Sequence, residues 1–250
     1  VSFGTSAPEM FVSLLSTLQS GGSTESIAVS NVVGSNIFNL LVVLGASALV
    51  TPLRVQLRLI RRDVPLLIAV SMATWAMGSA GTFTWVAGLA LLTVLAINLT
   101  WEVRTAREEG GGSTDELDED AAATLPVAIG KSLAGLVLLV VGSHVLVNGA
   151  TAAALALGVS QTVIGLTIVS IGTSAPELLV SAVAAFDGSP GLALGNALGS
   201  NITNITLVLG TTACIFPLLV PRPLVRRELP LLILISLCVY ALATRGTYDL

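Results

Sequence analysis

Two glutamates stand inside strongly apolar stretches of this 250-residue sequence, and each ends the same hexapeptide, GTSAPE. The first copy ends at Glu9 and the second at Glu177. A charged side chain at the centre of a bilayer costs about 2.5 kcal/mol or more, so such a carboxylate persists where it faces a polar cavity and has partners. One such glutamate could simply bridge helices through a protonated carboxyl group. Two at matched positions favour a functional pair.

Hydroxyl and amide side chains accompany the glutamates at helical spacing. In each GTSAPE copy a threonine, Thr5 or Thr173, precedes the glutamate by four residues, which predicts that the two side chains share one helix face. A second repeated motif, GSNIFN and GSNITN, spaces its serine and its last asparagine in the same way. Such residues either bond between helices or contact an ion. Because the motif is repeated, we favour ion contact for Ser35, Asn39, Ser200 and Asn204, and helix packing for Gly34, Gly199, Asn36 and Asn201.

Proline and glycine predict that both GTSAPE segments interrupt a helix. Pro8 has no N–H to bond the carbonyl of Gly4, and its ring crowds that turn, which glycine tolerates. Pro176 and Gly172 repeat this arrangement. We expect kinked or unwound spans whose freed carbonyls face protein, water or an ion. These carbonyls fall at Ser2–Gly4 and Ser170–Gly172.

The oxygen-rich composition of the motifs indicates a hard cation. The motifs contain no thiol and no imidazole, since His144, Cys214 and Cys238 lie elsewhere. Carboxylate, hydroxyl, amide and carbonyl oxygens select Na⁺, Ca²⁺ or Mg²⁺ over zinc or copper. Two glutamates neutralise Ca²⁺, whereas Mg²⁺ dehydrates reluctantly and suits such a cage less well. The sequence indicates no catalytic residue and no cofactor, so we expect a cation-binding protein that is not an enzyme.

Composition predicts the elements that hold these residues. The chain is 54% hydrophobic and only 10% charged, too few charges for the surface of a soluble domain. Apolar runs of about 17–25 residues, enough to cross a bilayer, recur along it. The net charge of −4 argues against nucleic-acid binding. We predict an all-α polytopic membrane protein with eight spans, at about 1–20, 27–49, 64–80, 83–101, 125–147, 161–186, 192–219 and 229–244.

The sequence is also internally duplicated. Residues 1–18 match residues 169–186, and residues 28–45 match residues 193–210, each pair with 10 identities in 18 positions. LIRRDVPLLIAVS at 59–71 then matches LVRRELPLLILIS at 224–236. An odd number of crossings, five, separates the two GTSAPE spans, so the copies are predicted to run in opposite directions. Such an inverted-topology repeat is found in many secondary transporters.

The repeat predicts the domain organisation. We expect a first repeat at 1–104, an acidic linker at 105–124 and a second repeat at 125–250. The span before the second GTSAPE has no counterpart ahead of Val1, and the span after the first repeat has none beyond Leu250. Two complete repeats therefore make ten spans, and we expect the first and the last to be missing from this sequence.

Positive charge predicts which side of the membrane each loop faces. The loops after even-numbered spans are the richer in arginine, so we expect them, with the linker 105–124, to be cytoplasmic. A cluster at Arg222, Arg226 and Arg227 on the other side opposes this assignment. The arginines that favour it are Arg54, Arg58, Arg61, Arg62, Arg104, Arg107 and Arg245.

With GTSAPE followed by GSNIFN, and GTSAPE again followed by GSNITN, the chain resembles the cation/calcium exchanger superfamily, specifically prokaryotic sodium/calcium exchangers. The resemblance covers essentially the whole chain. It implies ten transmembrane helices in two inverted halves, in a prokaryotic plasma membrane. It also implies a secondary antiporter whose partners are Ca²⁺, Na⁺ and the lipid bilayer, and which extrudes Ca²⁺ in exchange for Na⁺ by alternating access.

The same resemblance implies a set of ion-coordinating residues around the two glutamates. In the family four sites cluster there, one for Ca²⁺ and the rest for Na⁺, and competition for the shared carboxylates produces exchange. The implied positions are Thr5, Ser6, Glu9, Ser35, Asn39, Thr173, Ser174, Glu177, Ser200 and Asn204, with the carbonyls of Ser2 and Ser170.

Other functions stay open at this point. Some relatives carry aspartate at the positions of Asn39 or Asn204, so the two formal charges here leave the Na⁺ stoichiometry and any K⁺ dependence undecided. Exchange of Ca²⁺ for H⁺ is the alternative within the superfamily, and proton-coupled relatives differ around the second motif. A cation channel and a non-transporting membrane scaffold are the alternatives from other classes.

Overall fold

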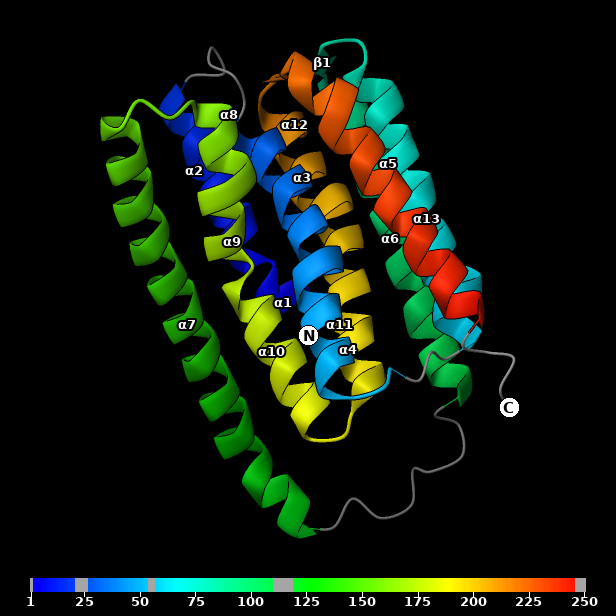
Figure 1. Cartoon of the computed structure of the whole chain (residues 1–250). Helices are drawn as coiled ribbons and strands as arrows, with labels where there is room; N and C mark the ends of the chain where they lie inside the picture. The colour runs from blue at the N-terminus through cyan, green and yellow to red at the C-terminus, as the bar shows by residue number, and fades with distance from the viewer. Residues whose placement is uncertain (1, 21–26, 54–56, 110–118, 246–250) are drawn as a thin grey trace.

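Helices form almost all of the chain that this computed structural model describes, namely residues 2–20, 27–53, 57–109 and 119–245 (Figure 1). The first half contains α1 (Ser2–Thr5), α2 (Ala7–Ser20), α3 (Ile27–Phe38), η1 (Asn39–Val43), α4 (Leu44–Val50), η2 (Leu59–Asp63), α5 (Val64–Gly78) and α6 (Trp85–Glu109), where η marks a π-helical segment. The second half contains α7 (Glu119–Ala156), α8 (Gln161–Ile164), η3 (Gly165–Val169), α9 (Ser170–Thr173), α10 (Ala175–Phe186), α11 (Pro190–Thr203), η4 (Asn204–Leu209), α12 (Gly210–Ile215), η5 (Leu224–Glu228) and α13 (Leu229–Arg245). A short antiparallel ladder joins the halves by pairing β1 (Thr82–Phe83) with β2 (Leu218–Leu219).

Four helical stretches in the described residues are long and apolar enough to cross a membrane. A fifth arises if the bent pair Leu166–Thr173 and Ala175–Phe186 is one span. All eight predicted ranges contain helix, but the remaining ones do not meet that length and composition by themselves, so the count of eight spans stays a prediction. The four stretches are Ile27–Val50, Trp85–Thr105, Pro190–Ile215 and Leu224–Arg245.

Two of these four stretches form the centre of the bundle. In the most apolar parts of Ile27–Val50 and Pro190–Ile215, 67% and 78% of the residues are buried, against 17% and 28% for the two stretches that contain α6 and α13. In Figure 1 the two buried rods stand side by side in the middle, with α5, α6 and α13 on one flank and α7 on the other. The rods that carry the GSN motifs are therefore enclosed by other helices, and apolar side chains of the flanking helices face outward.

The repeated segments run in opposite directions in Figure 1. The rod from α3 through α4 descends, whereas the rod from α11 through α12 ascends, and α1–α2 ascends where α9–α10 descends. The α1 helix packs against α11, and α9 packs against α3. Each GTSAPE segment therefore lies against the GSN segment of the other repeat.

The helix boundaries differ from those of the predicted linker. Residues 105–109 continue α6, and residues 119–124 belong to the start of α7, while residues 110–118 lie outside the described residues. The α6 helix extends beyond the apolar run because alanine, arginine and glutamate at its end are good helix formers in water as well as in lipid. The division into domains at 1–104 and 125–250 stays a prediction.

Two of the π-helical segments begin at predicted ion-binding residues. The η1 segment begins at Asn39 and η4 begins at Asn204, which are the last residues of the two GSN motifs. A π-helical turn widens the helix by one residue and is frequent at functional sites. The matched turns place both asparagines at equivalent irregularities in the two central rods.

A glycine in each GSN motif permits close contact with the opposite GTSAPE segment. A Cβ on Gly34 would meet the Ser170 hydroxyl and would lie 2.6 Å from the backbone oxygen of Leu166. A Cβ on Gly199 would lie 2.5 Å from the Ser2 hydroxyl and 3.1 Å from its Cβ. The two glycines hold equivalent positions in the two repeats. An added Cβ would meet backbone atoms at Gly34, whereas at Gly199 it would meet only a side chain.

We predict that Gly34→Ala destabilises the protein by about 1–3 kcal/mol through overpacking. Gly199→Ala should cost less, because the Ser2 side chain can rotate away. Gly195→Ala on α11 is the control, since its added Cβ meets no atom of the described residues within 4 Å. Thermal unfolding in detergent measures the three variants, and equal melting temperatures for all of them would contradict the predicted contacts.

Candidate cation site

Each GTSAPE segment ends one helix and begins another. The first break falls at Ser6, between α1 and α2, and the second at Ser174, between α9 and α10. The second pair of helices is bent by 49°. Each proline then sits at the start of the new helix, where its missing N–H costs nothing. The predicted interruption is confirmed, and it leaves Glu9 and Glu177 in the first turn of a helix, where the helix dipole favours a negative charge.

Glu9 is fully buried and is bound by the second GTSAPE segment. Its Oε1 accepts a hydrogen bond from the Ser174 hydroxyl at 3.1 Å. Its Oε2 has no hydrogen-bond partner among the described residues. Oε1 of Glu9 is therefore held by a hydrogen bond, and Oε2 is available as an acceptor.

Glu177 has the equivalent environment, supplied by the first segment. The Ser6 hydroxyl donates to its Oε1 at 3.5 Å, and the preceding Thr5 lies 3.4 Å from the Ser200 hydroxyl. In the part of the chain that the structure describes, its Oε2 also lacks a partner. The side chain is fully buried, as is that of Glu9, and the two carboxylates repel each other when both are ionised.

The hydroxyls therefore cross between the repeats. The four-residue spacing predicted that Thr5 would share a helix face with Glu9, yet outside its own segment the Thr5 hydroxyl contacts Asn196 and Ser200, and the Thr173 hydroxyl contacts Asn31. The helix break between each threonine and the following glutamate explains the difference, because helical spacing holds only along an unbroken helix. Each half of the site thus combines residues from both repeats.

Amide oxygens of the GSN motifs are buried acceptors without a donor in the described part of the chain, as are the two glutamate Oε2 atoms. Within the described residues, Asn39 Oδ1 and Asn204 Oδ1 lack hydrogen-bond partners, as do the two glutamate Oε2 atoms, although all four side chains are fully buried. A buried acceptor without a donor costs about 1–3 kcal/mol, and a cation removes that cost. The same described residues contain no cluster of three His, Cys, Asp or Glu side chains, so hydroxyl and amide oxygens would supply the other ligands. This donor set fits Na⁺ or Ca²⁺.

The GSN motifs meet across the centre. Asn36 donates its Nδ2 to the backbone oxygen of Asn201 at 3.1 Å, and Asn201 donates to the backbone oxygen of Asn36 at the same distance. Asn204 Nδ2 donates to Asn36 Oδ1 at 3.2 Å and to the Ser35 hydroxyl at 3.4 Å. The packing role expected for Asn36 and Asn201 agrees with these contacts, which tie the two central rods together.

Ser2 and Ser170 lie differently from the expectation. Each carbonyl accepts the amide N–H four residues later, at 3.1 Å, and also the nearby threonine hydroxyl, so these two carbonyls are not freed. Pro8 and Pro176 lack the N–H that would otherwise bond the carbonyls of Gly4 and Gly172 four residues earlier, and they leave the donors to the serine carbonyls in place. The serine hydroxyls point to backbone oxygens of α11 and α3, at 3.4 and 3.1 Å.

The sequence motifs did not identify two buried asparagines, Asn31 and Asn196, as part of the site. Asn31 Oδ1 accepts the Thr173 hydroxyl at 3.3 Å, and Asn196 Oδ1 accepts the Thr5 hydroxyl at 3.5 Å. A signal existed, because the two asparagines align with each other in the repeat and precede the GSN serines by four residues. Their partners lie on other helices, which spacing along one helix does not reveal.

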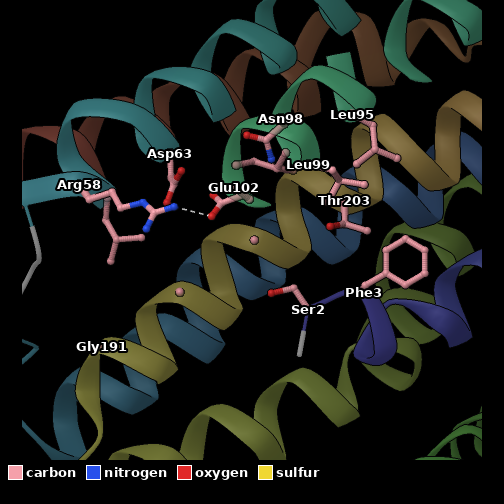
Figure 2. A pocket seen from close by; sticks show the side chains of 14 residues that line it. Ser2, Phe3, Arg58, Asp63, Leu95, Asn98, Leu99, Glu102, Gly191 and Thr203 are labelled. Carbon is pink, nitrogen blue, oxygen red and sulfur yellow. Dashed lines mark hydrogen bonds and ion pairs between the residues drawn. The ribbon is translucent and has the colours of Figure 1, made fainter. Parts of the chain in front are cut away.

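A charged cavity of about 460 Å³ approaches the site from the end of α1. Figure 2 shows Arg58, Asp63, Asn98 and Glu102 at one part of its wall and Ser2 at another. Arg58 forms an ion pair with Glu102 at 2.6 Å. Neither Glu9 nor Glu177 lines this cavity, and both are fully buried. The glutamates are therefore closed off from it.

This fold closely matches a solved exchanger. The chain superposes on the sodium-calcium exchanger NCX_Mj with a TM-score of 0.76 at 32% sequence identity, over 97% of this chain and 76% of that one. Fold and buried carboxylates together define the class, a multi-pass membrane cation exchanger.

The family follows from the sequence comparison. The model of the family "Sodium/calcium exchanger protein" matches residues 1–103 and 127–247, and the chain belongs to this family of transporters, as the repeated motifs indicated. Similar relatives include the inner membrane protein YrbG of Escherichia coli K12, 34% identical over 243 residues, which are 95% of this chain and 74% of the relative. Another is the sodium/calcium exchanger MaX1 of Methanosarcina acetivorans, 30% identical over 283 residues, covering 98% of this chain and 80% of that protein.

We predict that Asn36→Ala destabilises the protein by about 1–3 kcal/mol, because it leaves the Asn201 carbonyl and one Asn204 amide proton without their partners. Thr93→Ala on the exposed face of α6 is the control, and should change stability by less than about 0.5 kcal/mol. Thermal unfolding in detergent compares them. Equal losses would mean that the contact between the central rods contributes nothing specific.

Proposed function

We propose that this protein is a secondary antiporter that exchanges Na⁺ for Ca²⁺ and extrudes Ca²⁺ from the cell. One observation carries the proposal. Glu9 and Glu177 are fully buried, each is bound through Oε1 by a serine of the other repeat, and each has an Oε2 without a partner among the described residues. Membership of the sodium/calcium exchanger family supports the choice of ions.

The charge of the site supports a competition between ions. Two ionised carboxylates repel each other, and their burial removes the water that would screen them. One Ca²⁺ neutralises both charges, and Na⁺ ions binding in its place do the same. Because the carboxylates are shared, binding of one ion species excludes the other. A loaded, neutral site can then be moved between the two sides of the membrane at a lower free-energy cost than a charged, empty site.

The proposed ligands are the residues that the motifs indicated. Glu9 and Glu177 hold either cargo, with oxygens of Asn39 and Asn204 facing the shared centre. Threonine and serine hydroxyls supply the remaining contacts. The full proposed set is Thr5, Ser6, Glu9, Ser35, Asn39, Thr173, Ser174, Glu177, Ser200 and Asn204. The carbonyls of Ser2 and Ser170 each accept two hydrogen bonds within their own segment, so they join this set only when one of those bonds is released.

The closed site supports transport by alternating access. An ion shifts a protein between two states only if it binds them with different affinity. We infer that the halves 1–104 and 125–250 are inverted repeats, that this sequence forms eight spans, and that the glutamates face one side of the membrane at a time. The arginine distribution supports a cytoplasmic position for the segment 105–124, in a prokaryotic plasma membrane.

We predict that an imposed Na⁺ gradient alone drives uptake of ⁴⁵Ca²⁺ into liposomes that contain the protein. Uptake should fall to background when K⁺ or choline replaces Na⁺ at constant pH. Uptake that needs a pH gradient and ignores Na⁺ would instead establish Ca²⁺/H⁺ exchange. Flux without any counter-ion would indicate a channel.

We predict that Glu9→Gln and Glu177→Gln each reduce this exchange at least about 100-fold, because one lost charge leaves Ca²⁺ uncompensated in a buried site. Asp187→Asn is the matched control, since Asp187 is an exposed carboxyl at the end of α10, the helix that carries Glu177. The control should exchange ions at the rate of the parent. Retained exchange in either glutamine variant would refute the assignment of the site.

A further inference from the structure

We propose that Asn31 and Asn196 are positioning residues that turn the hydroxyl protons of Thr173 and Thr5 away from the transported cation. The inference rests on the proposed function, because it assigns these amides a role in binding the cargo. It adds two residues to the site that are not themselves ion ligands.

The hydrogen bonds of Asn196 define the orientation of its amide. Its Nδ2 donates to the Ser181 hydroxyl at 3.0 Å and to the backbone oxygen of Glu177 at 3.3 Å. Both amide protons are thereby used, so the oxygen must occupy the opposite position. That oxygen lies 3.5 Å from the hydroxyl of Thr5 and can only accept from it. The side chain is buried.

Asn31 makes the corresponding serine and threonine contacts at the equivalent position of the first repeat. Its Nδ2 donates to the Ser13 hydroxyl at 3.4 Å, and its Oδ1 accepts the Thr173 hydroxyl at 3.3 Å. Ser13 aligns with the Ser181 that anchors Asn196. Both repeats therefore connect a serine, an asparagine and the threonine of the opposite GTSAPE segment.

The orientation of the threonine hydroxyl matters because it has one proton and two lone pairs. The Thr5 hydroxyl lies 3.4 Å from the Ser200 hydroxyl, and the next residue, Ser6, donates to Glu177. A proton donated to Glu177 would place the positive end of the O–H dipole inside the cation site. Asn196 Oδ1 and the Ser2 carbonyl, the latter at 3.2 Å, both offer acceptors outside the carboxylate. With the proton held there, the lone pairs of Thr5 are available to a cation.

A purely structural role is the competing interpretation. Each asparagine also joins neighbouring helices, α11 to α10 through Ser181 and α3 to α2 through Ser13. Loss of such a bridge would lower stability without changing how Thr5 or Thr173 meets the ion. The two roles differ in one respect: a positioning role acts only while the threonine hydroxyl is present.

A double-mutant cycle on Ca²⁺ binding separates these roles. The protein and its variants are purified in detergent, and titration calorimetry measures their affinity for Ca²⁺. We expect Asn196→Leu to weaken Ca²⁺ binding about tenfold, in line with losses seen when groups behind metal ligands are removed. In a Thr5→Val background the same change should have almost no further effect. In a Thr173→Val background, which alters the other half of the site, it should retain its full effect.

A second cycle covers the case in which Asn196→Leu does not fold. Ser181→Ala removes the anchor of the amide but leaves Asn196 itself, and should weaken Ca²⁺ binding about threefold, as expected for one neutral hydrogen bond. Its effect should also vanish in the Thr5→Val background. Equal losses in both threonine backgrounds, or unchanged affinity in Asn196→Leu and Ser181→Ala, would overturn the positioning role. Failure of the parent to bind Ca²⁺ would overturn the proposed function instead, and the parent titration detects it separately.

Discussion

Two carboxyl groups buried at the centre of an apolar helical bundle impose the main constraint on this protein. Glu9 and Glu177 have no exposed surface, and an isolated charge at that depth is strongly disfavoured. The surrounding helices must therefore supply hydroxyls, amides and a helix N-terminus, and leave room for a neutralising cation. The serine hydroxyls on each Oε1 and the unpartnered Oε2 atoms of the described residues are two consequences of that requirement.

The bundle meets this requirement by local departures from the α-helix. GTSAPE stops one helix and starts another, and π-helical turns begin at Asn39 and Asn204. Irregular backbone within a bilayer is tolerated only where protein or a polar cavity covers it. The most irregular segments accordingly lie in the two central rods and against them, while the regular helices α6 and α13 have the exposed apolar faces.

Each repeat contains one glutamate of the site, and in the fold each glutamate is bound by a residue of the other repeat. Ser6 of the first repeat binds Glu177, and Ser174 of the second binds Glu9. The halves are similar but not identical: Asn204 donates to Asn36, whereas the amide of Asn39 has no partner among the described residues. The oxygen atoms around Asn39 and around Asn204 therefore differ in their hydrogen bonding, so the two halves of the site are not chemically identical.

The sequence alone determined the membrane class, the family and the residue types of the site. Hydropathy and repeated motifs are local properties, and a glutamate, a proline and a serine keep their chemistry wherever the chain places them. Only the tertiary structure decided which residues meet. The Thr5 hydroxyl contacts Asn196 and Ser200 of the second repeat, because the helix breaks after Thr5 and the opposite repeat packs against the break. Asn31 and Asn196 were missed for the same reason: their partners lie on other helices, and contacts between helices depend on packing, which no spacing along the chain encodes.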